Sequence, residues 1–299
     1  MKPILVIGST CVDIMIKIDH LPHSQENLHP TSQSMALGGC AYNVASILNL
    51  FEIPHTFISP VGGGIYGDYV KKHLEQQGIS IPIYLPEQEN GCCYCLVEAS
   101  GERTFMSYHG VEYRFQKEWM NDYEIADYSM IYLCGLEIGE DTGIQLIEYL
   151  EEHPGPTICF APGPRGILIG HDQLNRLLAL HPLLHVNEIE ALELSHCSQV
   201  EEAAKVLQTM THNTVIITLG ERGAYCREAD GTTYAAPGIP VDVVDTIGAG
   251  DAHIGTILSC LAKDRSLKEA IVKANQVSAA VVGVSGASLS PEAFLNHRF

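Results

Sequence analysis

Near the end of this 299-residue chain stands the stretch Val241-Asp242-Val243-Val244-Asp245-Thr246-Ile247-Gly248-Ala249-Gly250-Asp251-Ala252. Its first half is rich in β-branched residues, which predicts a strand that ends at Asp245. Apolar residues then recur at helical spacing, at Ile254, Ile257, Leu258 and Leu261. The stretch therefore predicts a strand, a tight turn and the start of a helix.

The turn of this stretch has the residues that an anion site needs. Gly248, Ala249 and Gly250 carry no bulky side chain, so a ligand can approach their backbone closely. The unpaired amides and the dipole at the start of a helix favour a phosphate or a developing negative charge. Asp251 follows where a carboxylate can take a proton from a hydroxyl group, which suits phosphoryl transfer to an alcohol. The alternative is a packed helix start that Asp251 caps.

The composition limits the classes of protein to consider. Apolar residues make up 46% of the chain, which is enough for a large core. No apolar run approaches a membrane span and no signal-peptide cleavage pattern is present, so we expect a cytoplasmic protein. The net charge of −19 argues against nucleic acid or an anionic membrane as a partner. The 14 histidines form no pattern typical of a transition-metal site.

A second helix start carries small and polar residues. Gly38 and Gly39 precede an apolar helix, and Asn43 lies one turn into it. The two glycines allow a ligand to come close, and the Asn43 amide offers both the donor and the acceptor that a sugar hydroxyl needs. The alternative is an ordinary helix start with Asn43 facing solvent.

Polar residues also follow two later strands. Glu137 comes after a strand at 129–134, at the edge where parallel sheets bind ligands, although a surface carboxylate is the alternative. Asn187 and Glu190 follow a strand at 183–186 and lie about one helical turn apart. Mg²⁺ on nucleotide phosphates is their natural partner, because Mg²⁺ keeps several waters and uses few carboxylates. A helix cap with a capping-box glutamate explains the same pair, and both can hold.

The string Asp-Thr-x-Gly-Ala-Gly-Asp at 245–251 resembles the signature of the ribokinase-like carbohydrate kinases, the PfkB family. The Gly-Gly-x-x-x-Asn string at 38–43 and the Asn-x-x-Glu string at 187–190 resemble two further motifs of that family. The resemblance implies one domain over residues 1–299, a three-layer α/β/α sandwich with a mostly parallel central sheet. It also implies a small β-sheet lid from strands at about 12–36 and 90–112, through which a homodimer can form.

The resemblance further implies a role for each matching residue. The acceptor site would comprise Asp13, Gly38, Gly39, Asn43 and Glu137. The nucleotide site would comprise Asn187, Thr218, Gly220, Gly223 and Asn275, and Glu190 would hold Mg²⁺ through water. A monovalent cation, K⁺, would be enclosed by Asp245, Ile247, Gly286 and Ser290. A turn carboxylate is the alternative for Asp13.

The sequence thus predicts an ATP-dependent kinase that phosphorylates a primary hydroxyl of a small sugar. Asp251 would be the base, and residues 248–251 would form the anion site. The lid segments contain few Lys or Arg residues, which favours a neutral acceptor. A nucleoside kinase of the adenosine or pseudouridine type is the first alternative. A catalytically silent sugar-binding regulatory protein is the second, and the intact Asp251 argues against it.

Overall fold

The computed structural model describes residues 1–163, 166–284 and 286–297. Its strands are β1 (Ile4–Ile7), β2 (Cys11–Lys17), β3 (Ser32–Gly38), β4 (His55–Ile58), β5 (Val61–Gly63), β6 (Tyr84–Glu89), β7 (Cys92–Val97), β8 (Arg103–Tyr108), β9 (Met130–Cys134), β10 (Thr157–Ala161), β11 (Leu183–Asn187), β12 (Val215–Thr218), β13 (Ala224–Arg227) and β14 (Thr233–Ala236). Its helices are α1 (Cys40–Leu50), α2 (Gly64–Gln76), α3 (Gly135–Ile138), α4 (Gly143–Glu152), α5 (His171–Leu178), α6 (Glu188–Ser195), α7 (Val200–Thr211), α8 (Ala249–Ala262), α9 (Leu267–Val282) and α10 (Pro291–Asn296). Among the described residues, none of these helices has the length and hydropathy of a membrane-spanning segment.

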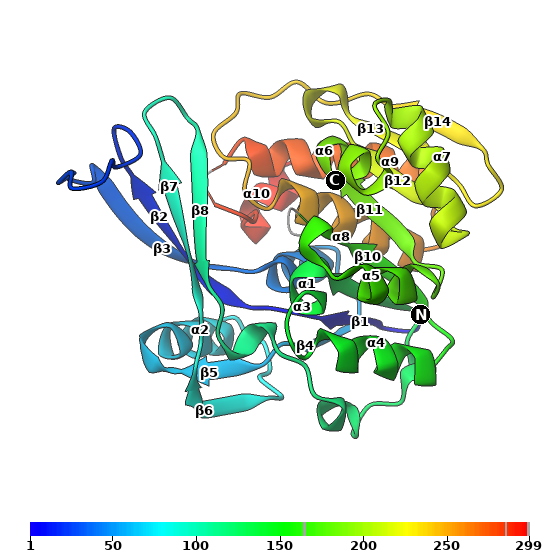
Figure 1. Cartoon of the computed structure of the whole chain (residues 1–299), viewed down its shortest axis with the longest axis horizontal. Coiled ribbons are helices and arrows are strands. Elements are labelled where there is room, and N and C mark those ends of the chain that lie inside the picture. The colour runs from blue at the N-terminus through cyan, green and yellow to red at the C-terminus, as the bar shows by residue number, and fades with distance from the viewer. Residues whose placement is uncertain (164–165, 285, 298–299) are drawn as a thin grey trace.

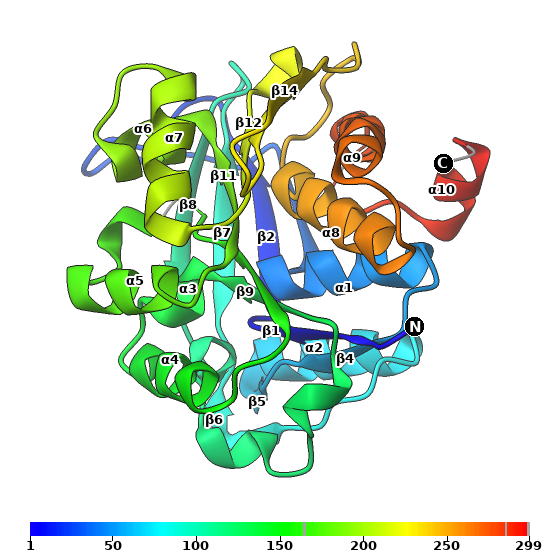
Figure 2. The ribbon, with the colours of Figure 1, turned by 90° about the vertical axis from the view of Figure 1, so that its right-hand side faces the viewer.

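An eight-stranded sheet forms the centre of the molecule, in the order β14-β13-β12-β11-β10-β9-β1-β4. The strands from β4 to β12 are parallel, and β13 and β14 are antiparallel to their neighbours. Both faces are covered, because helices α1, α8 and α9 lie on one side and α4, α5 and α7 on the other (Figure 2). Apolar strands such as β1 are buried throughout, as a sheet covered on both faces requires. The fold is therefore a three-layer α/β/α sandwich with a mostly parallel sheet.

A separate sheet of four strands, called the small sheet here, has the order β3-β2-β7-β8 and extends from one side of the sandwich (Figure 1). The register pairs Asp13 with Cys93 and Cys93 with Ser107. Cys95 pairs with Phe105, two residues further along. Because strand residues two apart share a face, these side chains lie on one face of the small sheet.

One predicted element differs in the structure. Residues 241–245 form no strand: the amides of Val244 and Asp245 both donate to Val282 O at the end of α9, over 2.9 and 3.1 Å. Without a partner strand, β-branched residues do not make a strand on their own. Residues 61–63 form the short strand β5 beside β6. A Cβ on Gly63 would lie 2.1 Å from Pro86 O, so the pairing itself needs glycine.

The packing of α8 against α1 brings the two helix starts of the sequence analysis to one edge of the sheet. Gly255 of α8 faces Ile47 of α1 so closely that an added Cβ would lie 2.9 Å from the Ile47 Cβ. Both helices bury most of their residues against this contact and the sheet. The absence of a side chain at Gly255 therefore sets the distance between the two helices.

The close approach at Gly255 predicts a loss of stability for Gly255→Ala. The added methyl group must displace Ile47 or the helix axis, and overpacking of this kind outweighs the better helix propensity of alanine. We expect the free energy of unfolding in urea to fall by about 1 kcal/mol. Gly139→Ala is the control, because the nearest atom to its Cβ would be Gly135 O at 3.6 Å. Equal unfolding free energies for both variants would contradict the packing described.

Candidate active site

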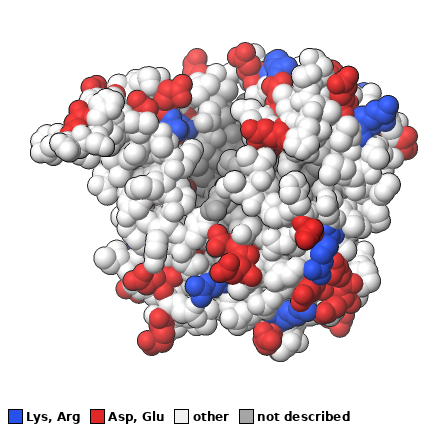
Figure 3. Space-filling model, viewed as in Figure 1, with Lys and Arg blue, Asp and Glu red and all other residues white. Residues whose placement is uncertain are grey.

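A cavity of about 980 Å³ lies where the carboxyl ends of β9 to β12 meet the small sheet and the start of α8. Figure 3 shows this face hollowed between the small sheet and the main body, with acidic side chains on the surface around it. The predicted site residues that line the cavity are Asp13, Gly39, Asn43, Asn187, Glu190, Thr218, Ile247, Gly248, Gly250 and Asp251. The structure thus brings together residues from distant parts of the chain.

Asp251 and Asn43 meet across the α1–α8 contact. The Asn43 Nδ2 donates to Asp251 Oδ2 over 2.8 Å, although 208 positions separate the two residues. Asn43 is buried, so the alternative of a solvent-facing asparagine is wrong. Its Oδ1 is also buried and has no hydrogen-bond partner among the described residues. One end of the amide therefore orients the carboxylate, and the other end is available to a ligand.

The surroundings of Asp251 suit a proton acceptor. Burial raises the pKa of this carboxyl to about 7, against hydrogen bonds from Asn43 and Cys40 that lower it. The nearby carboxylates of Asp13 and Glu137 add a smaller upward shift of the pKa. A base whose pKa lies close to neutral pH can take a proton from a hydroxyl and release it again.

The start of α8 has the form of an anion site. Gly248 is its N-cap, with φ +74°, and a Cβ there would lie 2.3 Å from Ala287 O. A Cβ on Gly250 would instead meet nothing within 4 Å, so an incoming group can approach this backbone. The amide of Ala249 makes a 3.4 Å bond to Thr246 O. Gly250 and Asp251 follow at positions whose amides have no partner within the helix.

The side of the cavity next to the small sheet is built around Asp13. Gly38 allows this carboxylate to lie where it does, because a Cβ at Gly38 would come within 2.0 Å of Asp13 Oδ2. Gly39 has φ +101°, and a Cβ there would lie 2.5 Å from Ser9 O. Burial raises the pKa of Asp13 to about 6. Both glycines therefore serve the packing of the chain around Asp13 as well as access to it.

Glu137 is buried and not a surface carboxylate. Its Oε1 accepts a hydrogen bond from the Ser9 amide over 2.7 Å, and its Oε2 is buried with no partner among the described residues. Burial raises the pKa of this carboxyl. Glu137 lies outside the lining of the large cavity and beside a smaller space next to Gly8 and Ile58. Its contact with Ser9 places it behind the acceptor residues.

Asn187 and Glu190 cap a helix and also line the cavity. Asn187 Oδ1 accepts from the Glu190 amide and Glu190 Oε2 accepts from the Asn187 amide, each over 2.9 Å. This is the capping box that the sequence left open. Burial raises the pKa of Glu190. Because both side chains still face the cavity, the cap does not replace the Mg²⁺ interpretation.

The other predicted nucleotide residues lie in different surroundings. Thr218 lines the cavity, and Gly220 has φ +60° at the turn after β12. Gly223 is packed against the chain, because a Cβ there would lie 2.1 Å from Ala236 O.

Asn275 is buried and lies outside the cavity lining. Its Nδ2 donates to Ala236 O and Pro237 O over 3.1 and 2.9 Å. Its Oδ1 lies 3.1 Å from His253 Nε2. Since both ends of the amide are engaged, the side chain holds α9 to α8 and to the segment after β14.

Asp245, expected to bind a monovalent cation, is buried and already surrounded by donors. Its Oδ1 accepts from the Ile247 amide over 2.9 Å, and its Oδ2 accepts from the Gly286 amide over 3.1 Å. The Arg103 Nη1 lies 2.8 Å from the same Oδ1. Ser290 caps α10, where its Oγ accepts from the Ala293 amide over 3.1 Å.

Arg103 is the charged cavity residue that sequence reasoning missed, along with uncharged ones such as Phe105 and Ser107. It stands on the same face of β8 as Phe105 and Ser107, which also line the cavity. The expectation of an acceptor site poor in Lys and Arg overlooked this residue. The alternation of side chains along a strand could have identified Arg103. Once the turn at 99–102 pairs β7 with β8, every second residue of β8 faces the cavity.

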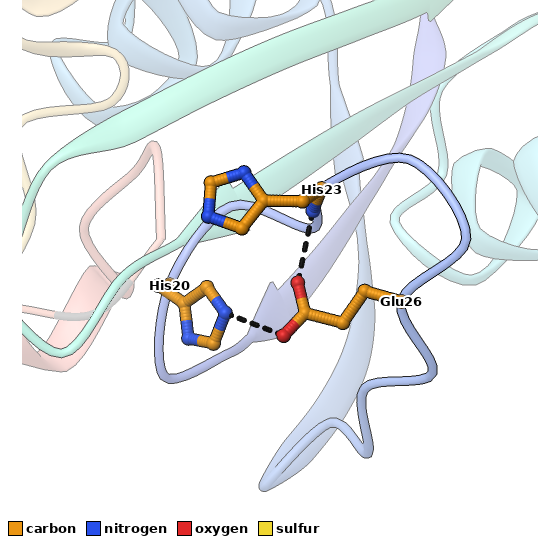
Figure 4. A group of neighbouring side chains, drawn as sticks. All are labelled: His20, His23 and Glu26. Atoms are coloured by element: carbon orange, nitrogen blue, oxygen red, sulfur yellow. Dashed lines mark hydrogen bonds and ion pairs between the residues drawn. The ribbon is translucent and has the colours of Figure 1, made fainter.

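Figure 4 shows a cluster of His20, His23 and Glu26 in the loop between β2 and β3. Glu26 Oε1 lies 2.9 Å from His20 Nε2, and its Oε2 accepts from the His23 amide over 2.9 Å. Both carboxylate oxygens are thus engaged, and hydrogen bonds to Glu26 and Asp19 raise the pKa of His20. These contacts hold the two sides of an exposed loop together, which explains why the three side chains lie close to one another.

Comparison with known proteins agrees with this geometry. A sequence model of the pfkB family carbohydrate kinases matches residues 1–293. The uncharacterized sugar kinase YegV of Escherichia coli (strain K12) is 32% identical, over 99% of this chain and 94% of that protein. The ATP-dependent ribose-1-phosphate kinase of Halopiger xanaduensis is 28% identical over 100% of both. The structure of ribokinase from Thermotoga maritima has a TM-score of 0.85 and 22% identity, over 100% of this chain and 99% of that one.

The chain therefore belongs to the pfkB family of carbohydrate kinases. The resemblance found in the sequence is confirmed, and so is the ribokinase-like α/β fold. The protein is a carbohydrate kinase, an enzyme that transfers a phosphoryl group from ATP to a sugar.

The raised pKa of Asp251 predicts a pH dependence of stability. Because the carboxyl ionises near pH 7 in the fold and near 3.8 when exposed, the folded state binds more protons between these values. The free energy of unfolding therefore falls as the pH rises through this window. Asp251→Asn has no carboxyl at this position, so its stability lacks this pH dependence. We therefore expect the free energy of unfolding of the variant, minus that of the wild type, to rise by about 2 kcal/mol between pH 5 and pH 8.

Urea unfolding at pH 5, 6, 7 and 8 measures this difference, with Asp122→Asn as the control at an exposed carboxyl. A difference between Asp251→Asn and the wild type that stays constant with pH would show that the Asp251 carboxyl is not shifted.

Proposed function

We propose that Asp251 is the general base of this kinase and that the start of α8 stabilises the phosphoryl group during transfer. The observation that carries the proposal is the Asn43–Asp251 hydrogen bond at the wall of the cavity, next to the open backbone of Gly250. A buried carboxylate that faces the same space as free helix-start amides meets the geometric needs of phosphoryl transfer to an alcohol.

In this reaction Asp251 takes the proton of the acceptor hydroxyl, whose oxygen forms a bond to the γ-phosphorus of ATP. The bond between the γ-phosphorus and the oxygen that bridges it to the β-phosphorus breaks, and ADP leaves with that oxygen. The amides of Gly250 and Asp251 face the charge that develops on the transferring group. Glu190 and Asn187 are suited to hold Mg²⁺ through water, and Mg²⁺ supplies charge neutralisation to the nucleotide phosphates.

The small sheet acts as the lid of the site. Its inner face contributes Asp13, Cys93, Phe105 and Ser107 to the cavity wall. Helix α2 packs against the outer face of this sheet, where the Tyr66 hydroxyl lies 2.8 Å from that of Tyr94, and the strands project past the sandwich so that the inner face covers one side of the cavity (Figure 1). Closure excludes water, which otherwise competes with the acceptor for the phosphoryl group.

The acceptor is a small neutral sugar with a primary hydroxyl. Asp13 and the free Oδ1 of Asn43 accept hydrogen bonds from its hydroxyl groups. Arg103 does not favour a phosphorylated acceptor, because its guanidinium is paired with Asp245. A nucleoside is the second candidate, because the exposed Phe105 ring on the inner face offers a surface on which a base can stack.

The proposed base predicts the behaviour of Asp251→Asn. We expect kcat to fall by roughly 10²–10⁴-fold, because proton transfer from the acceptor is lost. Binding of the acceptor is expected to persist, since the amide keeps the shape of the side chain. ADP release with Mg-ATP, across a panel of ribose, fructose, other neutral sugars and nucleosides, measures the rate. Asp122→Asn is the control at an exposed site.

An Asp251→Asn variant as fast as the wild type would exclude the proposed base. Wild-type silence on the whole panel, with sugar-induced thermal stabilisation still present, would favour the regulatory sugar-binding protein over the enzyme.

The small sheet is also the proposed contact of a homodimer. A row of paired residues crosses its outer face, from Met35 through Ile14 and Tyr94 to Met106. Helix α2 covers the middle of this row, where Ile14 is buried and the Tyr94 hydroxyl lies 2.8 Å from that of Tyr66. Met35 and Met106, at the two ends of the row, are exposed, and both lie on edge strands. Each copy has a net charge of −19, so two copies repel each other. Burial of an apolar surface offsets that repulsion, which makes an apolar patch the expected place of contact. A second copy would cover both edge strands.

A charged residue on this face is expected to separate the dimer. Met106→Glu places a carboxylate on the outer face of β8 without touching the cavity. We expect light scattering after size exclusion to show a monomer for this variant and a dimer for the wild type. Met210→Glu, at an exposed position of α7, is the control. A monomeric wild type, or a dimer that survives Met106→Glu, would exclude this contact.

A further inference from the structure

One buried ion pair joins the small sheet to the turn before α8. Arg103 is the first residue of β8, and its Nη1 lies 2.8 Å from Asp245 Oδ1 and 2.9 Å from Thr246 Oγ1. The side chains are 14% and 3% exposed for Arg103 and Asp245, so water screens the pair little. The tip of the β7–β8 hairpin and the loop that leads into α8 approach each other at the top of the molecule in Figure 1.

Arg103 balances the charge of Asp245. Asp245 also accepts hydrogen bonds from the amides of Ile247 and Gly286, which are neutral and bring no net charge. Among the described residues that line the cavity, Arg103 is the only Lys or Arg. A buried carboxylate needs a counter-charge, because removal from water penalises its ionised form. The guanidinium of Arg103 provides that charge.

While Arg103 is in place, the residues expected to enclose K⁺ do not fit a cation. A monovalent or divalent hard cation needs several oxygen ligands directed at one point. Asp245 is the one charged side chain among the four expected ligands, and its oxygens already accept from Arg103 Nη1 and from the Ile247 and Gly286 amides. A second positive charge at this place would repel Arg103.

We infer that Arg103 takes the place of the monovalent cation, so that this kinase needs no K⁺. The charge that orders residues 245–248 then comes from the small sheet itself. Closure of the small sheet and ordering of the anion site are therefore a single event. Arg103 is a positioning residue, since it acts through Asp245 and Thr246 and not on the acceptor. This inference rests on the proposed function only where activity is measured.

The first test compares salts on the wild-type protein alone. Thermal melting in 100 mM KCl, NaCl and choline chloride is expected to give the same Tm, and ADP release with the acceptor from the panel is expected to agree within about twofold. A Tm that rises specifically in KCl, or a stimulation by K⁺ of about tenfold, would overturn the inference. Because melting requires no sugar, this result stands even where the panel identifies no acceptor.

The second test removes the guanidinium. Arg103→Ala is expected to lower kcat/KM by roughly 10²-fold in choline chloride, as for the loss of one partner of a buried charge pair. KCl should restore part of the activity and raise the Tm of this variant, because the unpaired Asp245 can then accept a small cation. A merely structural side chain would give no such selectivity for K⁺. Arg103→Lys keeps the charge and should remain independent of K⁺.

Arg176→Ala is the matched control, because it breaks the ion pair with Glu151 away from the site. If Arg103→Ala and Arg176→Ala have the same rate, the same Tm and the same response to salt, the inference is overturned. If Arg103→Ala fails to fold, Arg103→Lys and the wild-type salt comparison still decide the matter.

Discussion

The hydrogen bond from Asn43 to Asp251 depends on the contact between α1 and α8, and the rest of the site depends on that bond. Each helix starts at the carboxyl edge of the main sheet, and each start is formed by glycine: Gly39 before α1 and Gly248 before α8. The packing of Gly255 on Ile47 fixes the distance between the helices. A carboxylate, its orienting amide and an anion site thus share one wall of the cavity because two helices pack closely.

Much of the fold could be predicted, because its signals are local. Buried runs such as Ile4–Ile7 and Val215–Thr218 are parallel-sheet strands, and glycines before apolar stripes mark the helices α1 and α8. The strand expected at 241–245 was wrong for a non-local reason. Propensity favours an extended chain at Val243 and Val244, but only a neighbouring strand could have turned that preference into sheet, and the segment meets the end of α9 instead.

The candidate site was predictable as a set of residues but not in its contacts. Asp251, Asn43 and Gly250 lie together at the cavity as expected. Tertiary packing decides which groups form hydrogen bonds, and the spacing of residues in the sequence does not reveal it. The Asn275 amide bonds to a backbone carbonyl and to His253, and one Glu137 oxygen accepts from the Ser9 amide. Arg103 was overlooked because its partner, Asp245, lies 142 positions further along the chain.

The long separation of Asn43 and Asp251 along the chain has a consequence for folding during synthesis. The two residues stand 208 positions apart, and α8, which carries Asp251, packs on α1 only after nearly the whole chain has been synthesised. Strand β1 and helix α1 leave the ribosome early and must wait for that partner with part of their apolar surface uncovered. An unfinished chain therefore lacks the Asn43–Asp251 pair, and its exposed α1 face is a place where nascent chains need protection from aggregation.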